Sequence, residues 1–177
     1  SGDRLSFGVH RKDREILEYI QSKLSPTTPI YDREDRNLKR NKVYLSSRFR
    51  FGNKAIISAL DKLGIKPRKT GYESLPNIPD EYKGHYLRGL FDGDGYVQIM
   101  KKQVIFKLSS SNVDYLNNLK DTIKNIGYVK KYDTNCYAWF VYKQQDVKFL
   151  YQFMYNNASF YLKRKYEKFK LIGERND

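Results

Sequence analysis

The pattern of apolar and polar residues predicts a mixture of helices and strands. Residues 43–50 alternate strictly, which predicts a strand with Val43 and Phe49 facing a core. Apolar residues with helical spacing follow Asp13, Asn53 and Asn112, three residues of a kind that caps helix N-termini. The chain is therefore expected to fold as α+β, with antiparallel strands and amphipathic helices.

The order of these elements repeats along the chain. At one constant offset, Phe7, Val9, Asp13, Ile16 and Leu17 precede Phe106, Leu108, Asn112, Tyr115 and Leu116. A proline-punctuated linker, Pro76–Pro79, separates the two parts, so we expect a first repeat over residues 1–75 and a second over 76–177. Chance similarity of common αβ patterns is the alternative explanation.

The stretch over residues 82–96 carries the most unusual pattern. Leu87, Leu90 and Phe91 occupy one face of a predicted helix. Gly89 and Gly93, four residues apart, leave a face without side chains where another backbone can approach. By the constant offset, the counterpart of this helix would precede residue 1. The first repeat is thus expected to lack its first helix and first strand.

The charge of the chain favours a polyanionic partner. It carries 34 Lys and Arg against 20 Asp and Glu, a formal net charge of +14, and the excess is spread over both halves. Its single cysteine, Cys136, excludes an internal disulfide and a cysteine-rich zinc site. Because no apolar run approaches the length of a membrane span, we expect no membrane association and a cytoplasmic location.

Two carboxylates, Asp92 and Asp94, alternate with glycines at the end of this predicted helix. A calcium-binding EF-hand loop is one interpretation, but its spacing fails. The sixth loop position would be Val97, where glycine is needed, and the twelfth would be Gln103, where glutamate is needed.

The nine residues Leu87–Gly95 read L-R-G-L-F-D-G-D-G, which resembles the signature of the LAGLIDADG homing endonucleases. The resemblance implies an α+β fold of two pseudo-symmetric αββαββα repeats with saddle-shaped antiparallel DNA-binding sheets. It also implies Mg²⁺-dependent cleavage of double-stranded DNA, with one metal-binding acid from each repeat. That acid is Asp94, with Gly95 beside it at the metal site, and Asp92 has a supporting role.

Other site residues follow from the same resemblance. The family places a catalytic lysine just before its closing helix, where Lys163 matches best, Lys165 is a close alternative and Lys69 is the counterpart in the first repeat. Polar residues that organise water correspond to Ser110 and Arg11, although neither is the more common glutamine. The outward faces of the strands would contact DNA through Gln98, Met100, Lys102, Lys107, Lys130, Tyr132, Arg33, Arg48 and Arg50.

The leading hypothesis is therefore a sequence-specific DNA endonuclease of an intron, intein or phage element, in a bacterial, phage or organellar host. With one acid in the chain, a monomer is expected to be inactive or weakly nicking. Self-association through the Gly89/Gly93 face would restore a pair of acids. A non-catalytic DNA-binding regulator of the same fold and an RNA-splicing maturase are the alternatives.

Overall fold

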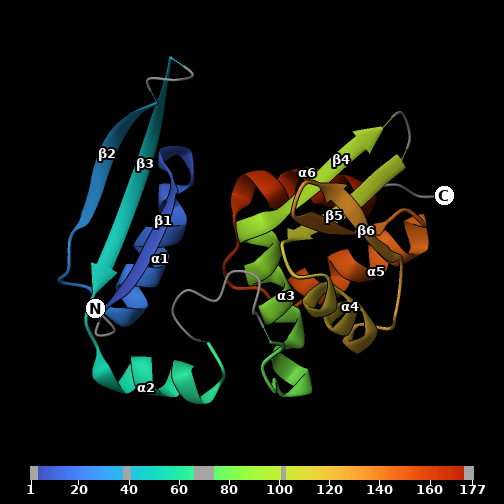
Figure 1. Ribbon diagram of the computed structural model, residues 1–177, viewed down its shortest axis with the longest axis horizontal. Coiled ribbons are helices and arrows are strands. Elements are labelled where there is room, and N and C mark those ends of the chain that lie inside the picture. Colours follow the sequence, from blue (N-terminus) through green and yellow to red (C-terminus); the bar gives the residue numbers. More distant parts are fainter. Residues whose placement is uncertain (1–3, 38–40, 66–73, 101–102, 174–177) are drawn as a thin grey trace. The chain divides into compact units, whose positions relative to one another are not determined.

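The computed structural model describes residues 4–37, 41–65, 74–100 and 103–173. The chain divides into two compact units, residues 1–62 and 63–177, which are described separately below (Figure 1). Among the described residues, none of the helices is both long and apolar enough to cross a membrane.

The first unit is a three-stranded antiparallel sheet with a helix packed on it. In chain order its elements are β1 (Leu5–His10), the 3-10 helix η1 (Arg11–Asp13), α1 (Arg14–Leu24), β2 (Ile30–Asn37), β3 (Lys42–Phe51) and α2 (Lys54–Lys62). The strand order is β1-β3-β2. Leu17 of α1 is fully buried against Phe49 and Phe51 of β3, and these residues form the core of the unit.

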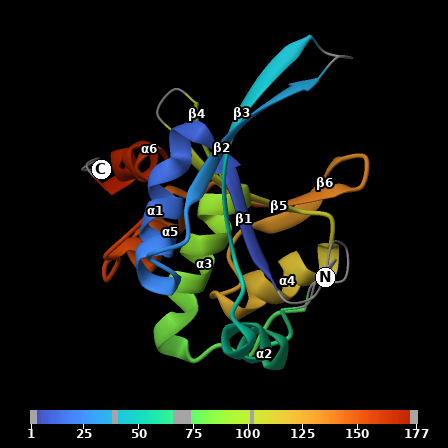
Figure 2. The same cartoon turned by 90° about the vertical axis from the view of Figure 1, so that its left-hand side faces the viewer.

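Two expectations for this unit need correction. Val43 shares a strand face with Phe49, but it is 54% exposed, because the β2–β3 hairpin extends beyond α1 (Figure 1, Figure 2). Asp13 does sit at the N-cap position of α1, yet its side chain makes no capping hydrogen bond there. Asn53 does cap α2, since its side-chain oxygen accepts a hydrogen bond from the Ile56 amide at 3.1 Å.

The second unit begins with a long helix and continues into a four-stranded antiparallel sheet. Its elements are α3 (Asp80–Asp94), β4 (Gly95–Met100), β5 (Gln103–Ser110), α4 (Val113–Thr122), β6 (Tyr128–Asp133), β7 (Cys136–Val141), α5 (Gln144–Tyr155) and α6 (Lys163–Gly173). The strand order is β4-β5-β7-β6. As predicted, Asn112 caps α4 by accepting a hydrogen bond from the Tyr115 amide.

The core of this unit lies between one face of the sheet and the helices. Phe106 of β5 and Trp139 of β7 contact each other edge to face, with ring centres 5.2 Å apart. Phe91 of α3 and Phe169 of α6 both pack on Phe106. Because alternate strand residues point to opposite faces, the other face of the sheet carries a separate set of side chains.

The two sheets share a topology. The order β1-β3-β2 in the first sheet matches the order β5-β7-β6 in the second. The described residues of the first unit include no strand in the position of β4. This supports two repeats, and the boundary at residue 75 stays a prediction. The helix expected over residues 82–96 ends two residues early, because Gly95 takes up an extended conformation and begins β4.

Candidate functional site

Helix α3 brings Asp94 to its C-terminal tip. Leu87 and Phe91 are fully buried and fix one face of the helix against the sheet. At Gly84 the helix approaches α5 so closely that a Cβ atom would overlap the carbonyl group of Phe153. Asp94 is the last residue of α3, and it is exposed.

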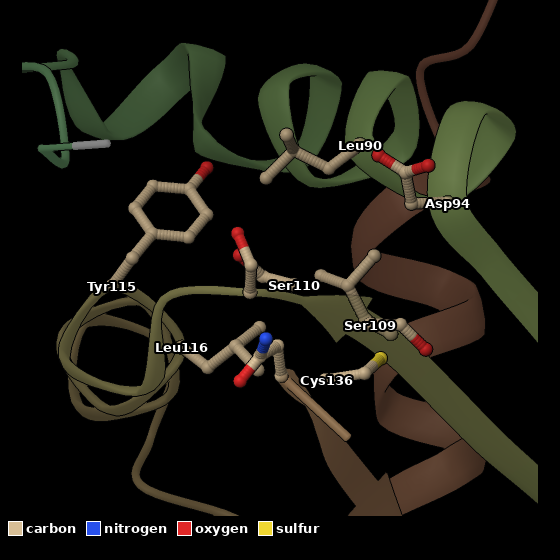
Figure 3. Close-up of a pocket in the computed structure, with 10 residues that line it drawn as sticks. Leu90, Asp94, Ser109, Ser110, Tyr115, Leu116 and Cys136 are labelled. Carbon is tan, nitrogen blue, oxygen red and sulfur yellow. The ribbon is translucent and has the colours of Figure 1, made fainter. Parts of the chain in front are cut away.

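The Asp94 carboxylate lies on a pocket of about 440 Å³ between α3, the end of β5 and α4 (Figure 3). The other residues that line this pocket are Leu90, Leu108, Ser109, Ser110, Ser111, Tyr115, Leu116, Asn135 and Cys136. Ser110, expected to organise water, is thus in the same pocket as Asp94. The pocket combines one carboxylate and several hydroxyl groups with the apolar side chains of Leu90, Leu108 and Leu116.

Asp92 lies in the opposite environment. Its side chain is buried, and its Oδ2 atom accepts a hydrogen bond from the Leu162 amide at 3.2 Å. Its Oδ1 atom is buried without a hydrogen-bond partner among the described residues. Burial raises the pKa of this carboxyl to about 6, because desolvation penalises the charged form. Asp92 thus links the end of α3 to the residue before α6, and its supporting role stays a prediction.

The lysines expected at the site have different environments. Lys163 is the first residue of α6 and is exposed. Lys165 is only 7% exposed, and its ammonium group donates hydrogen bonds to the carbonyl oxygens of Phe91, Asp92 and Gly93. Lys69 lies outside the described residues.

The glycines of the motif also divide by environment. A Cβ at Gly95 would overlap the ring and the carbonyl group of Phe91, so the turn from α3 into β4 requires glycine. The Gly95 amide donates a hydrogen bond to the Phe91 carbonyl. At Gly89 and Gly93, in contrast, a Cβ would meet no described atom within 4 Å. Within the second unit, no described residue therefore covers the face expected to receive another helix.

The outer face of the second sheet holds most of the residues expected to contact DNA. Gln98 and Met100 are exposed on β4. The Lys107 ammonium lies 3.1 Å from the ring centre of Tyr132, and that of Lys130 lies 4.9 Å from the ring centre of Phe140. These cations thus stand over aromatic rings on one surface. Lys102 lies outside the described residues.

Apart from Tyr132, the aromatic residues of this surface were not predicted from the sequence. Phe140 packs there with Ile105 and Ala138, away from the main core. Tyr128 and Tyr142 stack on its ring, with ring centres 6.0 Å and 5.9 Å away, and their own hydrogen bond raises the pKa of Tyr142 to about 12. The run from Cys136 to Tyr142 is almost entirely apolar, so its own pattern does not show which residues face outward. The neighbouring β6 strand alternates, and pairing the run with β6 could have identified the outward-facing residues.

In the first unit, Arg33, Arg48 and Arg50 share the outer face of the sheet. Arg48 pairs across the strands with Gly8 and Tyr31, on the side opposite the buried Phe49. Asp35 lies 3.7 Å from the Arg33 guanidinium and 3.9 Å from that of Arg48. Exposed pairs of this kind contribute at most about 1 kcal/mol, so both guanidinium groups can exchange Asp35 for another anion at little cost.

A family model, the LAGLIDADG-like domain, matches residues 81–162, which run from the start of α3 to the residue before α6. Residues 81–162 of this chain are therefore similar to a LAGLIDADG-like domain. The resemblance drawn from residues 87–95 is thereby confirmed. The LAGLIDADG-like domain includes Asp94, its pocket and the whole second sheet.

Solved structures show the same fold. The homing endonuclease I-WcaI, bound to its DNA recognition sequence, has a TM-score of 0.65 and 16% identity over 92% of this chain and 74% of its own. I-SmaMI, bound to an uncleaved DNA target in the presence of calcium ions, has a TM-score of 0.57 and 12% identity over 86% and 74%. The N-terminal LAGLIDADG domain of DUF199/WhiA has a TM-score of 0.55 and 12% identity over 95% and 77%. The expected LAGLIDADG fold is confirmed.

One curated relative is a cell division protein. The probable cell division protein WhiA of Clostridium acetobutylicum is 28% identical over 125 residues, which are 67% of this chain and 39% of that protein. The chain therefore spans well under half the length of this relative. By name, then, the relatives of the LAGLIDADG-like domain include both endonucleases and a cell division protein.

The fold of this family implies a divalent metal ion, and the described residues fit one only in part. They contain no group of three or more His, Cys, Asp or Glu side chains that could hold a metal ion. Mg²⁺, however, is commonly bound through one or two carboxylates, with water and substrate phosphate as the remaining ligands. The exposed Asp94 carboxylate meets the first of these needs, and a second acid would have to come from elsewhere.

Proposed function

We propose that this chain binds double-stranded DNA through the outer faces of its sheets and cleaves it when a second acid joins Asp94. The observation that carries the proposal is the position of Asp94. It is exposed at the tip of α3, one residue before β4, whose outer face carries Gln98 and Met100. A group that acts on the DNA backbone thus adjoins a surface that can read base edges.

Electrostatics supports DNA as the partner. The formal net charge is +14, and the outer faces carry Lys107 and Lys130 in one unit and Arg33, Arg48 and Arg50 in the other. Cations of this kind neutralise phosphates and release counterions, which supplies affinity independent of sequence. The aromatic side chains between them can contact bases and thymine methyl groups. I-WcaI and I-SmaMI, which share the fold, are bound to DNA in their structures.

A metal ion at Asp94 would supply the chemistry of cleavage. A bound divalent ion lowers the pKa of its water and stabilises the charge that develops on the phosphate. In this chain Asp94 would hold the ion, with Gly95 fixing the backbone beside it, and the exposed Lys163 would contact the phosphate. Mg²⁺ is the proposed ion, since it prefers oxygen ligands and retains water.

The second acid is proposed to arrive on another LAGLIDADG helix. No described residue of the second unit covers the Gly89/Gly93 face of α3, and the glycines have no side chain to prevent close approach. A second copy of this chain packed on that face would bring two Asp94 carboxylates together. Cleavage would then rise more steeply than in direct proportion to protein concentration, whereas DNA binding by one copy would follow a simple one-site dependence.

Asp94→Asn tests this proposal. The target site is first obtained by selecting bound duplexes from a random library, and binding and cleavage are then measured with and without Mg²⁺. We expect the variant to keep its affinity within about twofold and to lose cleavage, because the amide cannot replace the carboxylate as a ligand. Full cleavage by the variant would contradict the role of Asp94, and failure to select any duplex would contradict DNA binding.

A non-catalytic DNA-binding regulator is the second candidate. It is favoured by the likeness to WhiA and by the single carboxylate that the described residues place at the pocket. In that case the unmodified protein would bind a selected duplex but would not cut either strand with Mg²⁺ or Mn²⁺ at any protein concentration. Mobile-element origin and a maturase activity stay predictions.

A further inference from the structure

The end of α3 and the beginning of α6 are joined by a set of buried hydrogen bonds. Lys165 Nζ donates to the carbonyl oxygens of Phe91 and Asp92 at 2.8 Å each, and to that of Gly93 at 3.2 Å. In the same direction, the backbone amide of Leu162 donates to the Asp92 carboxylate. The bonded residues are 70 to 74 positions apart in sequence, with the donors at the beginning of α6 and the acceptors at the end of α3.

The chemistry of helix ends explains why a lysine fits here. The last four carbonyl groups of a helix have no partner within it, and they carry a partial negative charge. An ammonium group has three donors and no acceptor, so it can satisfy three carbonyl groups at once. Lys165 is 7% exposed, and its charge also lies 5.6 Å from the ring centre of Phe91. The contacts offset the cost of burying that charge.

These contacts end one residue before Asp94. Lys165 holds the Gly93 carbonyl, and the next residue carries the exposed carboxylate of the pocket. The backbone that orients Asp94 is therefore fixed by a side chain from α6. Lys163, two residues before Lys165, is exposed at the first position of the same helix.

We infer that Lys165 is a positioning residue, which locks the last turn of α3 and so sets the direction of the Asp94 carboxylate, and that it does not touch DNA. Lys163 is the lysine of this pair that contacts phosphate. The role of Asp94 in cleavage rests on the proposed function. The lock itself is a property of the protein without DNA and can be tested separately.

The first measurement is amide hydrogen exchange in the free protein. Lys165→Gln removes the charge, and we expect exchange at the Gly95 amide, which is bonded to the Phe91 carbonyl, to speed up about tenfold or more. Lys163→Gln is the matched control and leaves this exchange unchanged, as do amides in β7 in both variants. Lys165→Arg keeps a charged donor and restores at least part of the protection.

Unchanged exchange at Gly95 in a folded Lys165→Gln protein would overturn the inference. An equal rise in exchange across the whole second unit would also overturn it, because Lys165 would then stabilise the unit in general. If Lys165→Gln does not fold, the comparison uses Lys165→Arg and Lys165→Met. Failure of all three to fold would again mean a general structural role.

The second measurement uses a selected DNA duplex and Mg²⁺. Lys165→Gln is expected to lower the single-turnover cleavage rate about tenfold or more while affinity stays within about twofold, and Lys165→Arg recovers part of the rate. Lys163→Gln instead weakens binding and reduces its salt dependence, as loss of a phosphate contact requires. A Lys165→Gln variant with lower affinity and a reduced salt dependence would show that Lys165 contacts DNA. Absence of cleavage by the unmodified protein would contradict the proposed function and leave the exchange result standing.

Discussion

At the scale of single residues, two neighbouring aspartates have opposite environments. Asp94 is exposed on the pocket, whereas Asp92 is 9% exposed and turned toward the beginning of α6. Helical geometry explains the difference, because residues two apart lie about 200° apart around the axis. One carboxylate can therefore serve a ligand while the other serves the fold.

The raised pKa of Asp92 predicts a dependence of stability on pH. The pKa of this carboxyl is about 6 in the folded protein and 3.8 in its reference state. Between these values the unfolded chain loses a proton that the folded protein keeps, so the free energy of unfolding falls as pH rises from about 4 to 6. A shift of about two units corresponds to about 3 kcal/mol.

Asp92→Asn keeps an acceptor for the Leu162 amide but cannot ionise. The stability of the variant relative to the unmodified protein should therefore increase by about 2–3 kcal/mol between pH 4 and pH 7. Urea unfolding of both proteins at several pH values measures this difference. The titration of all other groups is common to the two proteins and therefore cancels. A difference that does not change with pH would mean that Asp92 is not protonated in the folded protein near pH 5.

At the scale of elements, α3 has one crowded face and one open face. Gly84 lies on the crowded face, in contact with α5, and Gly89 lies where a Cβ would meet no described atom within 4 Å. The sequence alone suggested that Gly89 and Gly93 form the close-packing face. Gly84 was not singled out, because only the position of α5 makes a side chain there impossible.

A pair of alanine substitutions distinguishes these faces. Gly84→Ala should lower the free energy of unfolding by about 1–3 kcal/mol, since the new methyl group overlaps the Phe153 carbonyl. Gly89→Ala should raise it by up to about 1 kcal/mol, because alanine favours the helix. Both are measured by urea unfolding at low protein concentration. Loss of stability in Gly89→Ala under these conditions would show that its face is already covered.

The same substitution tests self-association. If a second copy packs on the Gly89/Gly93 face, a methyl group at Gly89 will separate the helices and weaken the dimer. Sedimentation velocity across a range of concentrations measures this, with the unmodified protein as reference. A dimer that is unchanged in Gly89→Ala would assign association to another surface.

The extent to which the sequence predicted the site depended on what each residue contacts. Position and spacing identified α3, its tip and Asp94, because helical periodicity and the motif are local properties. The burial of Lys165 was not predictable in this way. In sequence, the basic run Lys163–Lys165 looks like part of a solvent-exposed surface. Only the packing of α6 against α3 brings three carbonyl groups to Lys165. Long-range contacts of this kind leave no periodic signal.

At the scale of the whole molecule, positive charge accompanies both sheets. The chain has a formal net charge of +14, and each unit presents basic side chains on the outer face of its own sheet. The affinity for DNA is therefore expected to fall steeply as salt rises, and the slope counts the phosphates that are neutralised.

Lys107→Met tests whether the outer face of the second sheet contributes to this slope. We expect weaker binding to all duplexes and a slope reduced by about one, since one phosphate contact is lost. Lys83→Met is the control, because it removes the same charge from α3, where Lys83 pairs with Asp80 at 2.6 Å. Fluorescence anisotropy at several salt concentrations measures both, and equal slopes for the two variants would contradict the assignment of this face.

The direct passage from α3 into β4 has a consequence for changing this protein. Asp94 ends the helix and Gly95 begins the strand, with no connecting loop to absorb a change in length. Side chains alternate between the faces of a strand, so one residue inserted at this junction would turn Gln98 and Met100 toward the helices or force Asp94 out of its pocket. Single residues on β4 can be substituted, because a substitution leaves the length of the junction unchanged. The spacing between the carboxylate and those residues is fixed by the backbone.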